Sequence, residues 1–88
     1  MLYLVIETFK DPIPVYRRFR DSGRLAPEGL DYVASWLTDD FKRCYQVMQC
    51  DERRLLEDWI SRWSDLVQFE VIPVVTSAQA FEAVRPRL

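Results

Sequence analysis

The chain has 88 residues, of which 49% are hydrophobic and 30% charged, and its formal net charge is −2. This length fits a single domain spanning residues 1–88, and the apolar content excludes a disordered chain. Arg17, Arg18 and Arg20 form a small basic cluster that fits a solvated helix face, since acidic residues lie nearby. No longer basic stripe exists, so the sequence lacks the basic surface of a nucleic-acid-binding protein. We therefore expect no nucleic-acid partner.

Residues 2–9, rich in β-branched and aromatic types, predict the first strand. The segment from Asp11 to Pro14 breaks this strand, and Pro14 suits the first turn of a helix that runs to Ser22, with Gly23 as its expected stop. After a loop with proline and glycine, alternating side chains predict a second strand over residues 30–37.

A Thr-Asp-Asp turn at 38–40 predicts a hairpin to a third strand over residues 42–50. Asp51 is a good N-cap for a second helix. The apolar side chains of this helix recur at helical spacing and predict a wide buried stripe, formed by Leu55, Leu56, Trp59, Ile60 and Trp63.

The fourth strand is expected over residues 66–75, where Pro73 has no N–H to donate to a neighbouring strand. This residue therefore predicts an edge position in the sheet. A capping-box pattern, Thr76-x-x-Gln79, predicts a short terminal helix that would dock Phe81 and Val84 on the body.

The element order βαββαβ predicts an α+β, ferredoxin-like domain with sheet order 4-1-3-2 and both main helices on one face. Every strand offers apolar residues to both sides of the sheet, as Leu4 and Val5 do. A second sheet is the simplest cover for the face without helices. The pattern therefore predicts a homodimer that joins through the sheet faces.

Four segments together cover most of the chain: VIETFKD, YRRFRDSGRLAPEGLDYVASW, KRCYQVM and WISRWSDLVQFEVIPVVTS. In these segments the chain resembles a family of small bacterial proteins catalogued as a domain of unknown function. Such families are similar to the dimeric α/β-barrel superfamily, which implies a homodimer of ferredoxin-like protomers. That superfamily includes monooxygenases of antibiotic biosynthesis, muconolactone isomerases, haem-degrading enzymes and ligand-sensing domains.

The residue types present exclude several chemistries. Histidine is absent, so the commonest general base, metal ligand and proximal haem ligand are missing. Cys44 and Cys50 form no C-x-x-C motif, and on one strand they would lie ~20 Å apart, too far for a disulfide. Two free thiols fit a reducing compartment. We expect no cofactor and no metal.

The first residues carry neither the basic start nor the cleavage site of an export signal. Their apolar run contains Glu7 and is too short to cross a bilayer. We therefore expect a cytoplasmic protein that does not enter a membrane.

Two groups of residues could form a site. Glu7 and Arg43 lie at positions that an antiparallel pair of strands brings close together, which indicates a structural ion pair or a charged anchor in a pocket. The second group would line a pocket between helices and sheet, with one amide among aromatic rings: Tyr16, Tyr32, Trp36, Gln46, Trp59 and Trp63. Ordinary core packing is the alternative for these aromatic residues.

Two functions fit these features. The first is a homodimer that binds a small apolar or aromatic ligand or has a structural role. The second is a cofactor-independent enzyme of the monooxygenase or isomerase kind, with tyrosine, glutamine or arginine as donors in the helix–sheet cavity. The second rests on fold analogy.

Overall fold

A computed structural model describes all residues, 1–88. The chain folds as βαββαβ followed by a C-terminal helix and a last 3₁₀ turn, as the sequence predicted. The elements are β1 (Leu2–Phe9), α1 (Pro12–Ser22), β2 (Asp31–Leu37), β3 (Arg43–Gln49), α2 (Arg53–Ser61), β4 (Val67–Val74), α3 (Ser77–Val84) and η1 (Arg85–Arg87).

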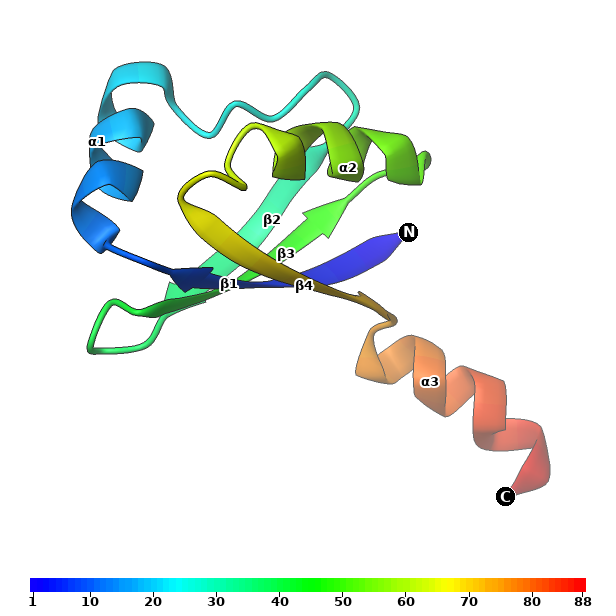
Figure 1. Cartoon of the computed structure of the whole chain (residues 1–88). Helices are drawn as coiled ribbons and strands as arrows, with labels where there is room; N and C mark the ends of the chain where they lie inside the picture. Colours follow the sequence, from blue (N-terminus) through cyan, green and yellow to red (C-terminus); the bar gives the residue numbers. More distant parts are fainter.

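The four strands form one antiparallel sheet in the order β2-β3-β1-β4. This is the ferredoxin-like arrangement, and it confirms the expected edge position of β4, the strand that contains Pro73. Helices α1 and α2 lie over the same face of the sheet (Figure 1). The opposite face has no helix over it, so the two faces have different surroundings.

Strand register decides which side chains meet the helices. In the β1–β3 pair, Val5 lies opposite Gln46 and Glu7 lies opposite Cys44. Alternate residues of both strands are buried under α1 and α2. The buried apolar core on this helix face comprises Tyr3, Val5, Phe9, Val15, Leu30, Cys44, Met48, Cys50, Leu56, Trp59, Trp63 and Val67.

A β-bulge changes the alternation expected for β2. The register with β3 skips a residue between Tyr32 and Ala34, which leaves Val33 as the extra residue. As a result Tyr32 and Ser35 both lie on the helix face, and the tyrosine hydroxyl lies 2.8 Å from Ser35 Oγ. Trp36 turns to the open face, although simple alternation had placed it with Tyr32.

The helix starts differ slightly from those expected. Asp11 caps α1, since its Oδ1 accepts a hydrogen bond from the backbone N–H of Ile13 at 3.0 Å. Pro12 occupies the first turn, where an N–H would have no partner. For α2 the N-cap is Glu52, without a side-chain cap bond, so the expected cap at Asp51 was wrong by one residue.

Helix α3 does not dock on the body. Its capping box forms as predicted, with Gln79 N donating to Thr76 Oγ1 at 3.0 Å. However, the helix has no buried residue and projects past β4, away from α1 and α2 (Figure 1). Phe81 and Val84 are 55% and 47% exposed, so the expected docking of these side chains is wrong for the single chain.

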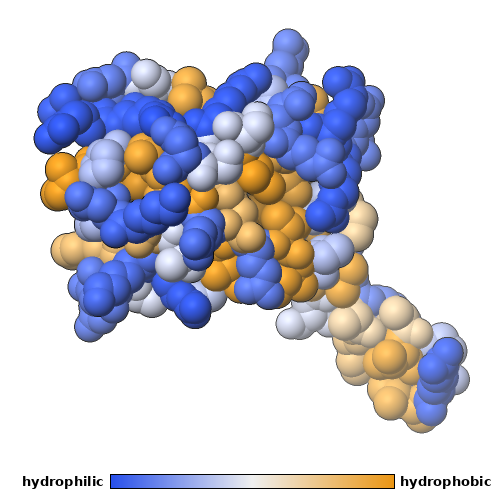
Figure 2. Space-filling view, viewed as in Figure 1, coloured by the Kyte–Doolittle hydropathy of each residue, from blue (hydrophilic) through white to orange (hydrophobic).

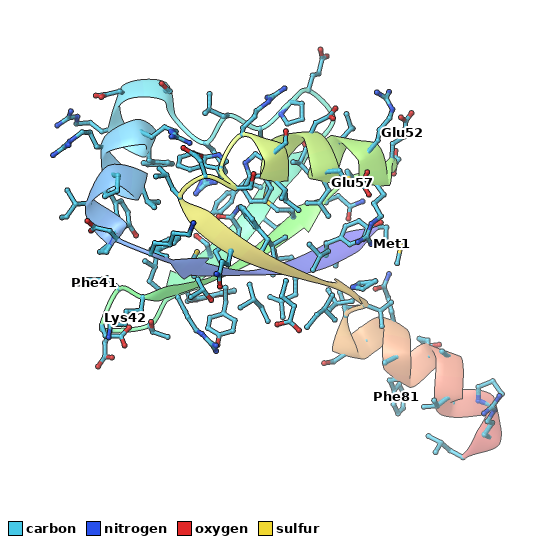
Figure 3. All side chains as sticks on the ribbon, in the orientation of Figure 1. Met1, Phe41, Lys42, Glu52, Glu57 and Phe81 are labelled. Atoms are coloured by element: carbon cyan, nitrogen blue, oxygen red, sulfur yellow. The ribbon has the colours of Figure 1, made fainter.

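The open face of the sheet carries many apolar side chains. Side chains extend from it into free space, and Phe81 lies on α3 clear of the strands (Figure 3). Hydrophobic atoms also gather over the middle of the visible body and along α3 in Figure 2. We call the apolar residues of this surface the open-face patch: Leu2, Leu4, Ile6, Ala34, Trp36, Tyr45, Val47, Ile72 and Val74.

No helix of the chain has the length and apolar character needed to span a membrane.

Candidate functional site

A cavity lies between the helix face of the sheet and the helices. Its volume is about 220 Å³. Most of its wall is apolar or aromatic, and its polar groups come from strands β1, β2 and β3 and from the loop after α1. The lining residues are Glu7, Phe9, Val15, Tyr16, Phe19, Arg24, Ser35, Leu37, Cys44, Gln46, Trp59 and Trp63.

Glu7 is the acidic group of the cavity. Strand register fixes its position, because it pairs with Cys44 of β3 on one side and Phe69 of β4 on the other. Its side chain is 7% exposed, and it takes part in none of the chain's ion pairs. Burial raises the pKa of Glu7 to about 7, opposed by the neighbouring Cys44 thiol and by the charge of Arg24. Glu7 therefore changes charge near neutral pH.

The thiol and phenol beside Glu7 stay neutral at physiological pH. Burial, followed by the charge and hydrogen bond of Glu7, raises the pKa of Cys44 to about 12. Burial, followed by the charges of Cys44 and Glu7, also raises the pKa of Tyr16. Cys44 is thus a poor nucleophile, because the thiolate is the reactive form. Tyr16 remains a hydrogen-bond donor.

Gln46 places an amide in the cavity wall. It is 4% exposed, and its Nε2 donates to Met48 Sδ at 3.3 Å. A thioether sulfur is a weak acceptor, and this is the amide's single hydrogen bond within the chain. Its remaining donor and acceptor capacity is available to a group inside the cavity.

Two tryptophans fix the loop that carries Arg24 to the edge of the cavity. The indole Nε1 of Trp59 and that of Trp63 both donate to the backbone carbonyl of Arg24, each at 2.9 Å. Arg62 Nη1 donates to the next carbonyl, of Leu25, at 2.7 Å. Leu25 has a φ of 62°, which is uncommon for a branched side chain. These three bonds hold the loop in that conformation.

The Arg24 side chain lies against aromatic faces at the edge of the cavity. Its guanidinium carbon is 3.8 Å from the ring centroid of Tyr32 and 5.3 Å from that of Phe19. Arg24 belongs to none of the chain's salt bridges. It is also the one cationic residue among those lining the cavity. The cavity thus contains a buried carboxyl, Glu7, and a guanidinium cation, Arg24, that are not paired with each other.

The structure places four of the six aromatic and amide candidates in the cavity wall: Tyr16, Gln46, Trp59 and Trp63. Tyr32 lies next to the cavity, under Arg24, without lining it. Trp36 pairs with Tyr45 on the open face and is 61% exposed. It therefore lies across the sheet from the cavity.

The structure does not bring Glu7 and Arg43 together. Arg43 pairs with Thr8, one position beyond the Glu7–Cys44 pair. Since successive residues of a strand point to opposite faces, Glu7 faces the helices and Arg43 faces away from them. The expected proximity of Glu7 and Arg43 was wrong by one residue of strand register. A shift of one residue always moves a side chain to the other face of the sheet.

Arg24 is the site residue that the sequence did not indicate. Nothing in its spacing relates it to Glu7, since it reaches the cavity through a loop whose path depends on indole donors far along the chain. A lone charged residue within an apolar strand was the visible signal for Glu7. The presence of Arg24 in the same cavity was not predictable from the sequence pattern.

Comparison with known proteins gives one match. A family model described as Domain of unknown function (DUF3303) matches residues 1–88. No curated protein and no solved structure matches the chain. The chain contains no group of three or more acidic or cysteine side chains that could hold a metal ion.

The buried carboxyl makes stability depend on pH in a defined direction. Glu7 has a pKa of 4.5 when exposed and about 7 in the folded chain. Between these values the folded state holds a proton that the unfolded state has lost, so the free energy of unfolding falls as pH rises. The charged or protonatable groups around Glu7 are Cys44 of β3, Tyr16 of α1 and Arg24 of the loop.

We predict that the free energy of unfolding of Glu7→Gln falls less than that of the wild type as pH rises. Its free energy of unfolding should gain about 3 kcal/mol on the wild type between pH 4 and pH 8, measured by urea unfolding at both pH values. Glu28→Gln, at an exposed position, is the control and should follow the wild type. A stability difference between Glu7→Gln and the wild type that does not change between pH 4 and pH 8 would contradict the prediction, and one that moves in favour of the wild type would indicate an ion pair.

Proposed function

Because the chain belongs to the DUF3303 family over its full length, and a family of unknown function supplies no reaction, we propose a function from the cavity: the protein binds a small, largely aromatic or apolar ligand there. The observation that carries this proposal is a buried carboxyl, Glu7, without an ion-pair partner in an aromatic wall. A buried acid without a partner destabilises a folded chain above its pKa. A ligand that uses the group gives a reason for its position.

The size and wall of the cavity support a ligand with one ring. The volume is about 220 Å³, larger than the cavity of about 150 Å³ that holds benzene in an engineered protein. Eight of the twelve lining residues are hydrophobic. Ligand sites combine such apolar walls with a few converging polar groups, which here are Glu7, Gln46 and Arg24.

A second candidate function is proton transfer without a cofactor. The pKa of Glu7, raised by burial to about 7, suits a general base near neutral pH. Its carboxylate would accept a proton from an acidic C–H or O–H of the ligand. The Gln46 amide or the Tyr16 hydroxyl would donate to the oxygen that gains charge. Exchange of a ligand C–H for solvent deuterium in the wild type, but not in Glu7→Gln, would distinguish this reaction from binding alone.

We also propose that two copies join through the open-face patch, as in a dimeric α/β barrel. The face spans four strands about 4.8 Å apart and about seven residues long, or ~440 Å² in projection. Two such faces, together with two α3 helices, approach the ~1,200 Å² that a specific interface needs. An isolated helix of eight residues is marginal in water, and α3 exposes Phe81 and Val84. A second copy is therefore the occupant that both apolar surfaces of the chain favour.

Ligand binding can be followed through the three indole N–H signals in a ¹H–¹⁵N spectrum. We predict that benzyl alcohol shifts the signals of Trp59 and Trp63, which contact the cavity, with an affinity in the millimolar range expected at ~0.5 kcal/mol per heavy atom. Trp36 lies on the other face and serves as the internal control. Its signal is identified with Trp36→Phe. Equal shifts of all three signals, or none at 10 mM ligand (~ten times the expected Kd), would contradict the proposal.

The dimer is tested by sedimentation at micromolar concentration. We predict a species of 21 kDa, twice the 10.5 kDa of the chain. Ile72→Lys places a charge in the open-face patch and should give the 10.5 kDa species. Ile13→Lys is the matched control, because Ile13 is 60% exposed on α1 and away from the sheet. A wild type that sediments only as the single chain rejects the dimer.

A further inference from the structure

We propose that the ligand of the cavity carries one anionic group, such as a carboxylate, that binds Arg24 while its ring lies between the tryptophans and the sheet. This inference rests on the proposed function and names the ligand class of that site. Its chemistry is that of a small aromatic acid. The surroundings of Arg24, the protonation of Glu7 and the size of the cavity all favour such a ligand.

Arg24 is a cation that the chain leaves without an anion. The five salt bridges of the chain use other arginines: Arg18, Arg20, Arg53, Arg54 and Arg85. Arg24 is partly buried and lines the cavity. A guanidinium at the edge of an apolar cavity attracts an anion more strongly than one in open water, since solvent screens it less.

The position of Arg24 is fixed before any ligand arrives. Its carbonyl is held by the Trp59 and Trp63 indoles. Its guanidinium lies over the Tyr32 ring at 3.8 Å. Contact with a ring face leaves the N–H groups in the plane of the guanidinium available, and these can bind both oxygens of a carboxylate. Little conformational entropy is then lost on binding.

Glu7 allows an anion to enter the same cavity. Its pKa, raised by burial to about 7, means that the carboxyl is mostly neutral at mildly acidic pH. A protonated carboxyl does not repel a carboxylate, and it can donate a hydrogen bond to it. An anion near Glu7 would in turn favour its protonated form, so ligand binding and proton binding support each other.

The cavity limits the size of the acid. Its volume of about 220 Å³ leaves room for one ring and a short polar group beyond the ~150 Å³ that holds a benzene ring. The aromatic wall provides edge and face contacts for that ring, from Trp59, Trp63 and Phe9. Benzoate is therefore the probe, and benzyl alcohol is its neutral analogue of similar size.

The experiment titrates the full-length chain with each probe at pH 6 and follows the Trp59 and Trp63 indole signals. We expect benzoate to bind about tenfold more tightly than benzyl alcohol, the advantage of a charge-assisted hydrogen bond over a neutral one. Arg24→Met should remove this preference, so that the two probes bind with similar affinity. Arg24→Lys should keep part of it, which distinguishes lost charge from a disturbed loop. Arg17→Met, on the exposed face of α1, is the matched control.

The outcomes separate this inference from the proposed function. If benzyl alcohol binds and benzoate binds no more tightly, or if Arg24→Met retains the benzoate preference, the inference is overturned and the proposed function stands. If neither probe shifts the indole signals of the wild type, both are overturned. A preference for benzoate that persists in Arg17→Met and disappears in Arg24→Met supports the inference.

Discussion

Two indole N–H groups donate to one backbone carbonyl, and the candidate site depends on this shared hydrogen bond. Trp59 lies in α2 and Trp63 just beyond it, whereas the carbonyl belongs to Arg24, in the loop after α1. A carbonyl oxygen has two lone pairs and can accept both bonds. The indole rings then form part of the cavity wall, while the carbonyl fixes the residue whose side chain carries the positive charge. One contact thus joins the two helical segments and shapes the space between them.

The cavity places opposite charges in an apolar space without pairing them. Burial raises the pKa of Glu7, and the charge of Arg24 only partly opposes that effect. A chain selected for stability alone would replace such an acid with an apolar residue or give it a close partner. Sites that bind or transform ligands commonly keep groups whose pKa is shifted in this way. This is the physical reason to regard the cavity as a functional site and not as a packing defect.

Much of the fold followed from the sequence because local patterns were strong: the order of elements, the edge position of Pro73 and the capping box at Thr76 all agree with the structure. Which face of each strand meets the helices was harder to predict, because both faces are apolar. The bulge at Val33 separated Trp36 from the cavity, and one step of register separated Glu7 from Arg43. Arg24 reaches the site through long-range contacts with tryptophans, which no local pattern encodes.

The central claim is that Glu7 is a buried acid with a pKa of about 7 inside a ligand cavity. The most direct test is an NMR titration of the Glu7 side-chain carboxyl carbon, identified by its loss in Glu7→Gln. The account predicts a midpoint at about pH 7, which moves upward when benzoate is present. A midpoint near 4.5, the value of an exposed glutamate, would show that the carboxyl is solvated and would contradict the account.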